Sequence, residues 1–183
     1  MNPINPEPPL PDTQAAASVK PTPAVYYAQK KGYDPVLTQK VWNAAEAQGM
    51  SPTMALALVS HESRFQTEAR NVNTNRTIDY GLFQLNSQYH PWFDWDVDKH
   101  IQYGMKFLAD NIRRYGTQGG LGIYNVGRSQ KPDKVAERAI YVGKVMGEYQ
   151  DVKRTMAGYV GWNPKFQMSI LSPVEIAKQQ GSG

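Results

Sequence analysis

Residues 54–59 constrain the fold of this chain most, because all six are apolar and they follow the helix-start signal Ser51-Pro52. A helix that is apolar on every side must be buried. We therefore expect a central buried helix with other elements packed around it. This apolar run is the longest in the chain, yet it is far shorter than the ~20 residues of a membrane span or the ~7–15 of a signal-peptide core. We expect neither.

Three further stretches place apolar residues at helical spacing. The first follows the N-cap signal Asp34-Pro35 and ends at Gly49, the second covers about residues 98–115, and the third covers about residues 133–149. Their expected core-facing residues are Leu37, Val41 and Ala44; Ile101, Met105, Leu108 and Ile112; and Val135, Ala139, Val142 and Met146. The predicted fold is mainly α, with a small irregular or β element at about residues 70–86, where Asn and Thr are frequent.

The distribution of proline predicts the domain organisation. Seven of the 13 prolines fall in the first 23 residues: Pro3, Pro6, Pro8, Pro9, Pro11, Pro21 and Pro23. Such a segment favours extended polyproline structure. We predict an extended arm or linker over residues 1–32, a helical domain over residues 33–150, and a C-terminal extension over residues 151–183 with a docking role.

Composition excludes several classes of site. The chain has no cysteine, which rules out disulfides, thiolate zinc sites and iron–sulfur clusters. His61-Glu62 lacks the second histidine of a zinc protease, since Phe65 stands there, and residues 94–105 lack the glycine and glutamate of a calcium loop. We expect no metal and no cofactor. The net charge of +4 is mildly basic, but without a basic stripe or a binding motif we expect no nucleic acid partner.

Two carboxyl groups are the strongest candidates for chemistry. Glu62 lies at the C-terminal end of the apolar helix, where apolar neighbours and the helix dipole both raise a carboxyl pKa. That suits a general acid. Asp79, 17 residues later, follows a polar loop that favours an ionised carboxylate. Two carboxyls in opposed environments are what glycosidic bond cleavage requires.

The residues around this pair carry a resemblance to known families. The stretch Glu62-Ser-x-Phe65-x-Thr67-x-Ala69-x-Asn71-x-Asn73-Thr74, followed by Asp79-Tyr80-Gly81-x-x-Gln84-x-Asn86-Ser87, resembles the active-site region of chicken-type animal lysozymes, which share the spacing of 17. The motifs Glu62-Ser63, Gly81-Leu82-Phe83-Gln84, Ile123-Tyr124-Asn125-Val126-Gly127 and Tyr141-Val142-Gly143-Lys144-Val145 resemble, in this order, those of lytic transglycosylases related to the soluble lytic transglycosylase. Together they cover roughly residues 35–150 and imply an α+β lysozyme-like fold with a cleft.

The resemblance also implies roles for single residues. Glu62 is the implied catalytic acid and base, and Asp79 matches the second catalytic carboxylate of the lysozymes. Asn73 matches an asparagine that hydrogen-bonds that aspartate, and Asn86 one that binds an N-acetyl sugar. The implied substrate-binding residues are Ser63, Asn73, Gln84, Asn86, Tyr124, Asn125 and Tyr141, with Tyr141 close to the catalytic Glu. Tyr89 and Trp92 follow where lysozymes place sugar-stacking tryptophans.

The implied function is cleavage of the β-1,4 bond between N-acetylmuramic acid and N-acetylglucosamine in peptidoglycan. A lytic transglycosylase uses Glu62 first as acid and then as base on the muramyl 6-hydroxyl, whereas a lysozyme employs Asp79 and admits water. Because the chain lacks the disulfides of animal lysozymes, we favour the transglycosylase and keep the lysozyme as the alternative. A catalytically slow structural or glycan-binding module is a third reading.

The expected partners are peptidoglycan glycan strands and a protein assembly, a phage tail or virion or a secretion machinery, held through the N-terminal arm. A wall-cutting enzyme must reach the cell wall or periplasm. Since we expect no signal peptide, we expect carriage by a phage virion, or release by a lysis or secretion system.

Overall fold

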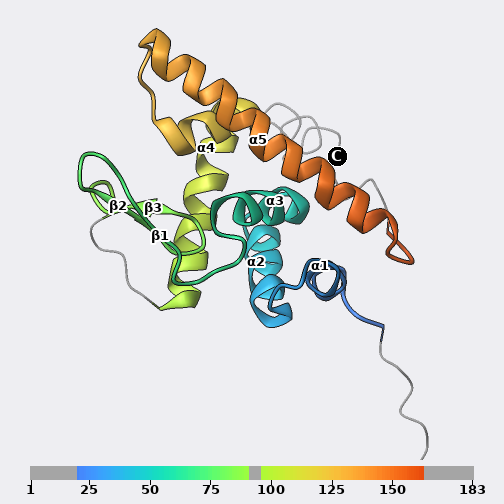
Figure 1. Cartoon of the computed structure of the whole chain (residues 1–183). Coiled ribbons are helices and arrows are strands. Elements are labelled where there is room, and N and C mark those ends of the chain that lie inside the picture. Colours follow the sequence, from blue (N-terminus) through green and yellow to red (C-terminus); the bar gives the residue numbers. More distant parts are fainter. Residues whose placement is uncertain (1–19, 91–95, 163–183) are drawn as a thin grey trace, which may run out of the picture.

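The computed structural model describes residues 20–90 and 96–162, in which five helices surround a common core and a small sheet lies to one side (Figure 1). The helices are α1 (Pro23–Lys31), α2 (Pro35–Ala47), α3 (Pro52–Ser63), α4 (Val97–Val126) and α5 (Pro132–Ala157). The strands are β1 (Arg70–Val72), β2 (Ile78–Tyr80) and β3 (Leu85–Asn86). The predicted mainly α fold with a small β element is therefore confirmed. No helix in the described ranges is long and apolar enough to cross a membrane.

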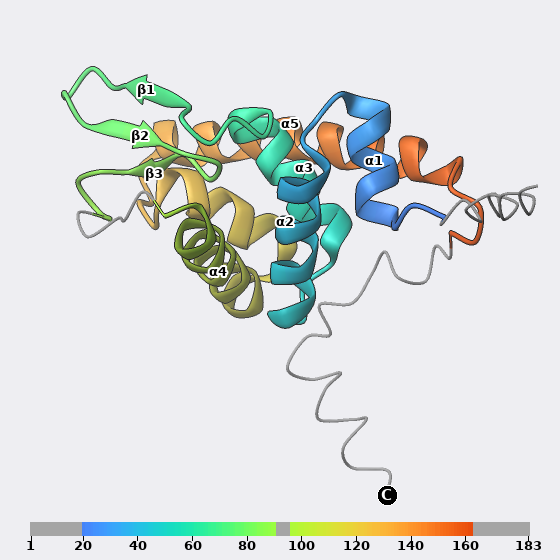
Figure 2. The same cartoon turned by 90° about the horizontal axis from the view of Figure 1, so that it is seen from below.

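Helix α3 is the central helix that the apolar run predicts. Its five residues from Ala55 to Val59 are fully buried, and it packs against α2 and α5. Figure 2 shows α5 running along one side of the molecule past both α3 and α1. Pro52 occupies the first turn of α3, where the missing amide hydrogen costs no helical hydrogen bond. The end of α3 that carries Glu62 is thereby held by packing on several sides.

Helix α4 does not end at Gly116, as the sequence predicts, but changes direction there. Gly116 has φ 72°, and the chain resumes helical structure as far as Val126. The second part folds back so closely that a Cβ at Gly120 would lie 2.6 Å from backbone atoms of Ile112. A glycine at this position permits the approach. The kink turns Tyr124 and Asn125 toward the same side as the sheet, where they line a cleft.

The stripe predicted for the last helix is right only in its second half, where Val142 and Met146 are partly buried against the core. Val135 and Ala139 are exposed, whereas the buried residues of α5 are Tyr141, Val145, Tyr149, Val152 and Met156. The N-terminal part of α5 extends beyond α3 and packs against the second part of α4, with Val135 and Ala139 facing solvent (Figure 1). The helix also continues to Ala157, which places the predicted domain boundary at residue 150 inside an unbroken helix.

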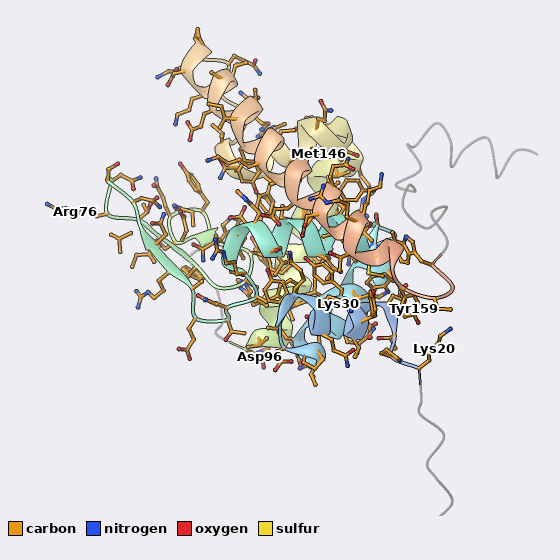
Figure 3. The ribbon with its side chains drawn as sticks, turned by 45° about the vertical axis from the view of Figure 1, so that its right-hand side comes forward. Lys20, Lys30, Arg76, Asp96, Met146 and Tyr159 are labelled. Atoms are coloured by element: carbon orange, nitrogen blue, oxygen red, sulfur yellow. The ribbon has the colours of Figure 1, made fainter. Side chains whose placement is uncertain are left out.

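The predicted extended arm of residues 1–32 is wrong for its last part. Thr22 caps α1 and Pro23 opens it, and Ala24, Tyr27 and Ala28 are fully buried against α2 and α5. Proline at the first helical position is favourable, so Pro23 marks a helix start as readily as an extended chain. Figure 3 shows Lys20 close to Tyr159, whose hydroxyl donates to the carbonyl of Pro21 at 2.8 Å. Residues 1–19 and the end of the C-terminal extension lie outside the described residues.

The sheet is antiparallel in the order β1-β2-β3. Its register sets Asp79 in β2 between Asn71 of β1 and Asn86 of β3. A carboxylate on the middle strand is therefore flanked by amide side chains from both neighbouring strands.

Candidate active site

Glu62 lies in the last turn of α3, where α5 crosses it. The hydroxyl of Tyr141 on α5 donates a hydrogen bond to Glu62 Oε1. Tyr141 is only 6% exposed and its ring meets His61 edge to face, so α5 holds the phenol in place. The Glu62 side chain is half-buried and lines a cleft. One oxygen is thus occupied by Tyr141, while the carboxyl group remains accessible from the cleft.

The environment of Glu62 favours its protonated form. Burial raises its pKa from 4.5 to about 7, the Tyr141 hydrogen bond opposes the increase, and the charge of Asp79 adds to it. Removing water from around a carboxylate disfavours the charged form because the protein interior solvates charge poorly. Near neutral pH a carboxyl group of this kind can both donate and accept a proton, as acid–base catalysis requires.

Asp79 has the opposite surroundings. Asn73 donates to Asp79 Oδ2 at 2.9 Å, and Asn86 donates to Asp79 Oδ1 at 2.7 Å. Both amides also donate to the hydroxyl of Thr77. The hydrogen bond implied between Asn73 and Asp79 is therefore present. The amide of Asn86, implied to bind an N-acetyl sugar, instead donates to Asp79 and Thr77. Two amide donors therefore hold the two oxygens of this carboxylate in one orientation.

A tight turn after β2 supports one side of the cleft. Gln84 donates to the carbonyls of Gly81 and Ala69 at 2.9 and 3.1 Å. The hydroxyl of Tyr124 donates to the carbonyl of Phe83 at 2.5 Å, which ties the kinked end of α4 to this turn. A Cβ at Gly81 would lie 2.6 Å from the ring of His100, so the turn requires a residue without a side chain.

His100 is a supporting residue that the sequence does not reveal. It is 3% exposed, and its Nε2 accepts the backbone N–H of Phe83 at 3.2 Å. Burial lowers its pKa to about 4, so the imidazole stays neutral and can accept this bond. The one sequence feature related to this contact is Gly81, and it does not identify its partner. A single histidine in α4 has no distinctive pattern, so His100 could not be predicted.

The two carboxyl groups face one cleft of about 1360 Å³. Of the predicted residues, the structure brings together Glu62, Asn73, Asp79, Gln84, Asn86, Tyr89, Tyr124 and Asn125 in its lining. Tyr141 is close behind Glu62 and acts on it directly. Trp92 lies outside the described residues. Three residues that were not predicted for the site also line this cleft: Arg114 and Tyr115, just before the kink of α4, and Arg128, just after the end of the helix.

The prediction that Ser63 binds substrate is corrected. Its side chain is buried, and Oγ donates to the carbonyl of Val59 at 3.2 Å, one turn earlier in α3. The helix orients successive side chains about 100° apart, so Glu62 faces the cleft while Ser63 faces the core. Ser63 contributes to packing at the end of α3.

Metal-binding groups are absent from residues 20–90 and 96–162: no three His, Asp or Glu side chains are placed to hold one ion. Asp96 caps α4, with Oδ1 accepting the backbone N–H groups of Asp98 and Lys99 at 2.9 and 3.0 Å. Asp96 is therefore the N-cap of α4.

Comparison with known proteins adds to this geometry. A family model described as the transglycosylase SLT domain matches residues 40–146. Protein IpgF of Shigella flexneri is 28% identical over 123 residues, which cover 58% of this chain and 76% of that protein. Lysozyme C of Penaeus merguiensis is 41% identical over 46 residues, and lysozyme c-1 of Anopheles gambiae is 49% identical over 39. These stretches cover 25% and 21% of this chain and only 28% and 26% of the two lysozymes.

Proposed function

This chain belongs to the transglycosylase SLT domain family, and we propose that it is a peptidoglycan lytic transglycosylase with Glu62 as its acid and base. The proposed bond is the β-1,4 linkage between N-acetylmuramic acid and N-acetylglucosamine. Support comes from one observation above all: the cleft contains a carboxyl group whose pKa burial raises to about 7, next to a second carboxylate held by two amides.

The proposed reaction uses Glu62 twice. Protonated Glu62 donates its proton to the bridging oxygen, and the bond from that oxygen to C1 of the muramyl residue breaks. The positive charge that develops at the muramyl ring faces the carboxylate of Asp79. The ionised Glu62 then accepts the proton of the muramyl 6-hydroxyl as its oxygen bonds to C1. The products are a free 4-hydroxyl and a 1,6-anhydro ring, no water is consumed, and Glu62 ends protonated.

The surrounding residues support each step. Tyr141 donates its hydrogen bond to Oε1 of Glu62, which leaves the other carboxyl oxygen to carry the proton that the substrate receives. Asn73 and Asn86 hold both oxygens of Asp79 and keep the carboxylate in one orientation. Tyr124 and Gln84 fix the wall on which the sugar would lie. Preorganised groups of this kind stabilise developing charge without having to move during the reaction.

Hydrolysis by a lysozyme mechanism is the second candidate. The observation that favours it is Asp79 itself, which faces the cleft with both oxygens held by amide donors. In that reaction Asp79 would stabilise or bond to C1, and water would complete the cleavage. The two candidates share Glu62 and differ in their products.

Turnover of purified peptidoglycan by the wild type and by Glu62→Gln tests the proposal. Glutamine has the same shape but cannot donate a proton, so we expect a loss of roughly 10²–10⁴-fold or more. Turnover of Glu62→Gln near the wild-type rate would refute the assignment and leave a structural or glycan-binding role.

Thermal unfolding of the same variant provides the control for folding. Because the raised pKa means that the native state holds this proton more tightly, stability is lost as pH rises from 4.5 to about 7. For the wild type this loss in the free energy of unfolding is roughly 3 kcal/mol at most. Glu62→Gln has no carboxyl group to titrate and does not suffer it. We expect it to melt above the wild type at pH 8, and the difference to vanish near pH 4.

A further inference from the structure

The charged residues of the cleft form two groups of opposite sign. Glu62 and Asp79 form the acidic group, and Arg114, Arg128 and Lys134 line the cleft beyond them. The pKa of Glu62 is set by burial, Tyr141 and Asp79, with no guanidinium among its causes, so the cations act elsewhere in the cleft.

Two of these cations have no acidic partner. Lys134 Nζ lies 2.6 Å from Glu137 Oε2, so that pair is neutral as a unit. Arg114 and Arg128 form no ion pair with any residue in the described ranges. Both are exposed and line the cleft together with Tyr115, and their positive charges help to lower the pKa of its phenol. We call Arg114, Tyr115 and Arg128 the cationic cluster.

The kink of α4 creates this cluster. Arg114 and Tyr115 end its first part, and Arg128 follows the capping residue Gly127 after the second part has folded back. Arg128 is four residues beyond Tyr124, which the turn at Phe83 anchors. Four peptide units place the two Cα atoms within about 15 Å of each other. The cluster therefore lies on the same wall as Tyr124, a short distance along it.

We propose that the cationic cluster is a carboxylate-binding subsite that receives the acidic peptide attached to the muramyl residue of peptidoglycan. The inference rests on the proposed function, which puts a glycan strand in the cleft. Peptidoglycan stem peptides carry free carboxylates, and the guanidinium group binds carboxylates in a two-pronged geometry. An extended peptide of four residues spans about 13 Å, and the cluster lines the same cleft as Glu62 and Asp79.

Charge complementarity favours this occupant over a continuous polyanion. Glu62 and Asp79 in the same cleft would repel a chain that carries a phosphate at every unit. A peptidoglycan strand avoids this conflict because its sugar backbone is neutral and only the peptide branches are acidic. The neutral backbone meets the carboxyl pair, and the acidic branch meets the cationic cluster.

The test compares three forms of one substrate. Three forms are digested at low salt: glycan strands with intact stem peptides, strands stripped by an amidase whose newly exposed lactyl carboxyls are then amidated, and stem-bearing strands whose carboxyls have been amidated. The wild type is measured beside Arg114→Gln/Arg128→Gln. The matched control is Arg70→Gln/Arg76→Gln, which removes two exposed arginines outside the cleft lining; Figure 3 shows Arg76 at the tip of the hairpin, pointing away from the helices.

For the wild type and the control we expect KM to be about three- to tenfold lower on stem-bearing strands than on stripped or amidated ones. This preference should shrink as salt screens the charges. In Arg114→Gln/Arg128→Gln the ratio of the KM values should approach one. Equal KM values for the wild type on all three substrates, or an unchanged ratio in the cluster variant, would overturn the proposal.

Binding separates this inference from the proposed function. Retention of the strands by Glu62→Gln is measured without turnover, with and without the two cluster substitutions. Stronger retention of stem-bearing strands that depends on the cluster supports the subsite even where the wild type cleaves nothing and the proposed activity fails. Equal retention of stem-bearing and stripped strands contradicts the subsite even where cleavage is confirmed.

Discussion

At Glu62, burial and two neighbouring side chains shift the pKa of one carboxyl group in different directions. Burial raises its pKa most, Asp79 raises it further, and Tyr141 lowers it by donating a hydrogen bond to the charged form. The value of about 7 is the balance of these effects. Because the first step needs the protonated acid, the proposed mechanism makes activity fall as pH rises through this value.

The alkaline limb of the pH profile is the range in which activity falls as Glu62 loses its proton. Tyr141→Phe and Asp79→Asn should move this limb in opposite directions. Without the phenol the pKa of Glu62 rises, so kcat/KM should stay high to a higher pH. Without the charge of Asp79 the pKa falls, so kcat/KM should decline at a lower pH. Initial rates on purified peptidoglycan between about pH 5 and pH 9 measure both shifts.

The sign of each shift is the decisive result. A substitution that only disturbed the structure would lower the rate at every pH and leave the limb in place. Val36→Ala, at a side chain that is 66% exposed, serves as the unshifted control. A limb that moves the same way in both variants would contradict the assignment of Glu62 as the titrating acid.

Residue types and spacing indicated the two carboxyl groups, because these are local features of the sequence, and the resemblance to lysozymes implied the hydrogen bond from Asn73. Ser63 was placed wrongly since the motif does not tell which side of a helix faces the cleft. His100 and the cationic cluster could not be predicted at all. They depend on contacts between residues far apart in the chain, and single side chains of these types carry no distinctive pattern.

At the scale of elements, the spacing of apolar residues predicted the helices that bury one continuous face. It failed where only part of a helix face is buried. Helices α2 and α3 begin at the predicted prolines. The early turns of α5 carry apolar residues that face solvent, so the predicted stripe is right at Val142 and Met146 but wrong at Val135 and Ala139. Helix α1 was missed because its N-terminal prolines continue a proline-rich segment.

Helix α1 gives a prediction about where the chain can be shortened. A chain that begins at residue 20 should fold and cleave as the full chain does, whereas one that begins at residue 33 should be destabilised. The second loses the fully buried Tyr27 and the ion pair of Lys31 with Asp151 at 2.6 Å. Removing a buried aromatic side chain alone costs roughly 3–5 kcal/mol. Thermal and denaturant unfolding measure the difference.

Tyr27→Ala in the full chain keeps this prediction testable if the shortened protein is insoluble. It should lower the free energy of unfolding by a similar amount. If the chain beginning at residue 33 unfolded at the same temperature as the full chain, α1 would be an appendage and the predicted boundary at residue 33 would be right.

For the whole molecule, one helical body formed by residues from α1 to α5 positions the cleft against a small sheet (Figure 1). Glu62 comes from the central helix, Asp79 from the middle strand, Tyr124 from the kinked end of α4 and Tyr141 from α5. Fold class and family could be predicted because four motifs occur in order along the chain. Docking of the first residues to a carrier assembly falls on residues 1–19, outside the described ranges, and stays a prediction.

In the proposed reaction Glu62 accepts the proton of the muramyl 6-hydroxyl, and the 6-oxygen bonds to C1 to close a ring without water. Mass spectrometry of the fragments released from purified peptidoglycan tests this directly, because anhydro and hydrolysed ends differ by one water. We predict 1,6-anhydromuramyl ends from the wild type and none from Glu62→Gln. Reducing muramyl ends alone from the wild type would contradict the account and assign the chain the lysozyme reaction.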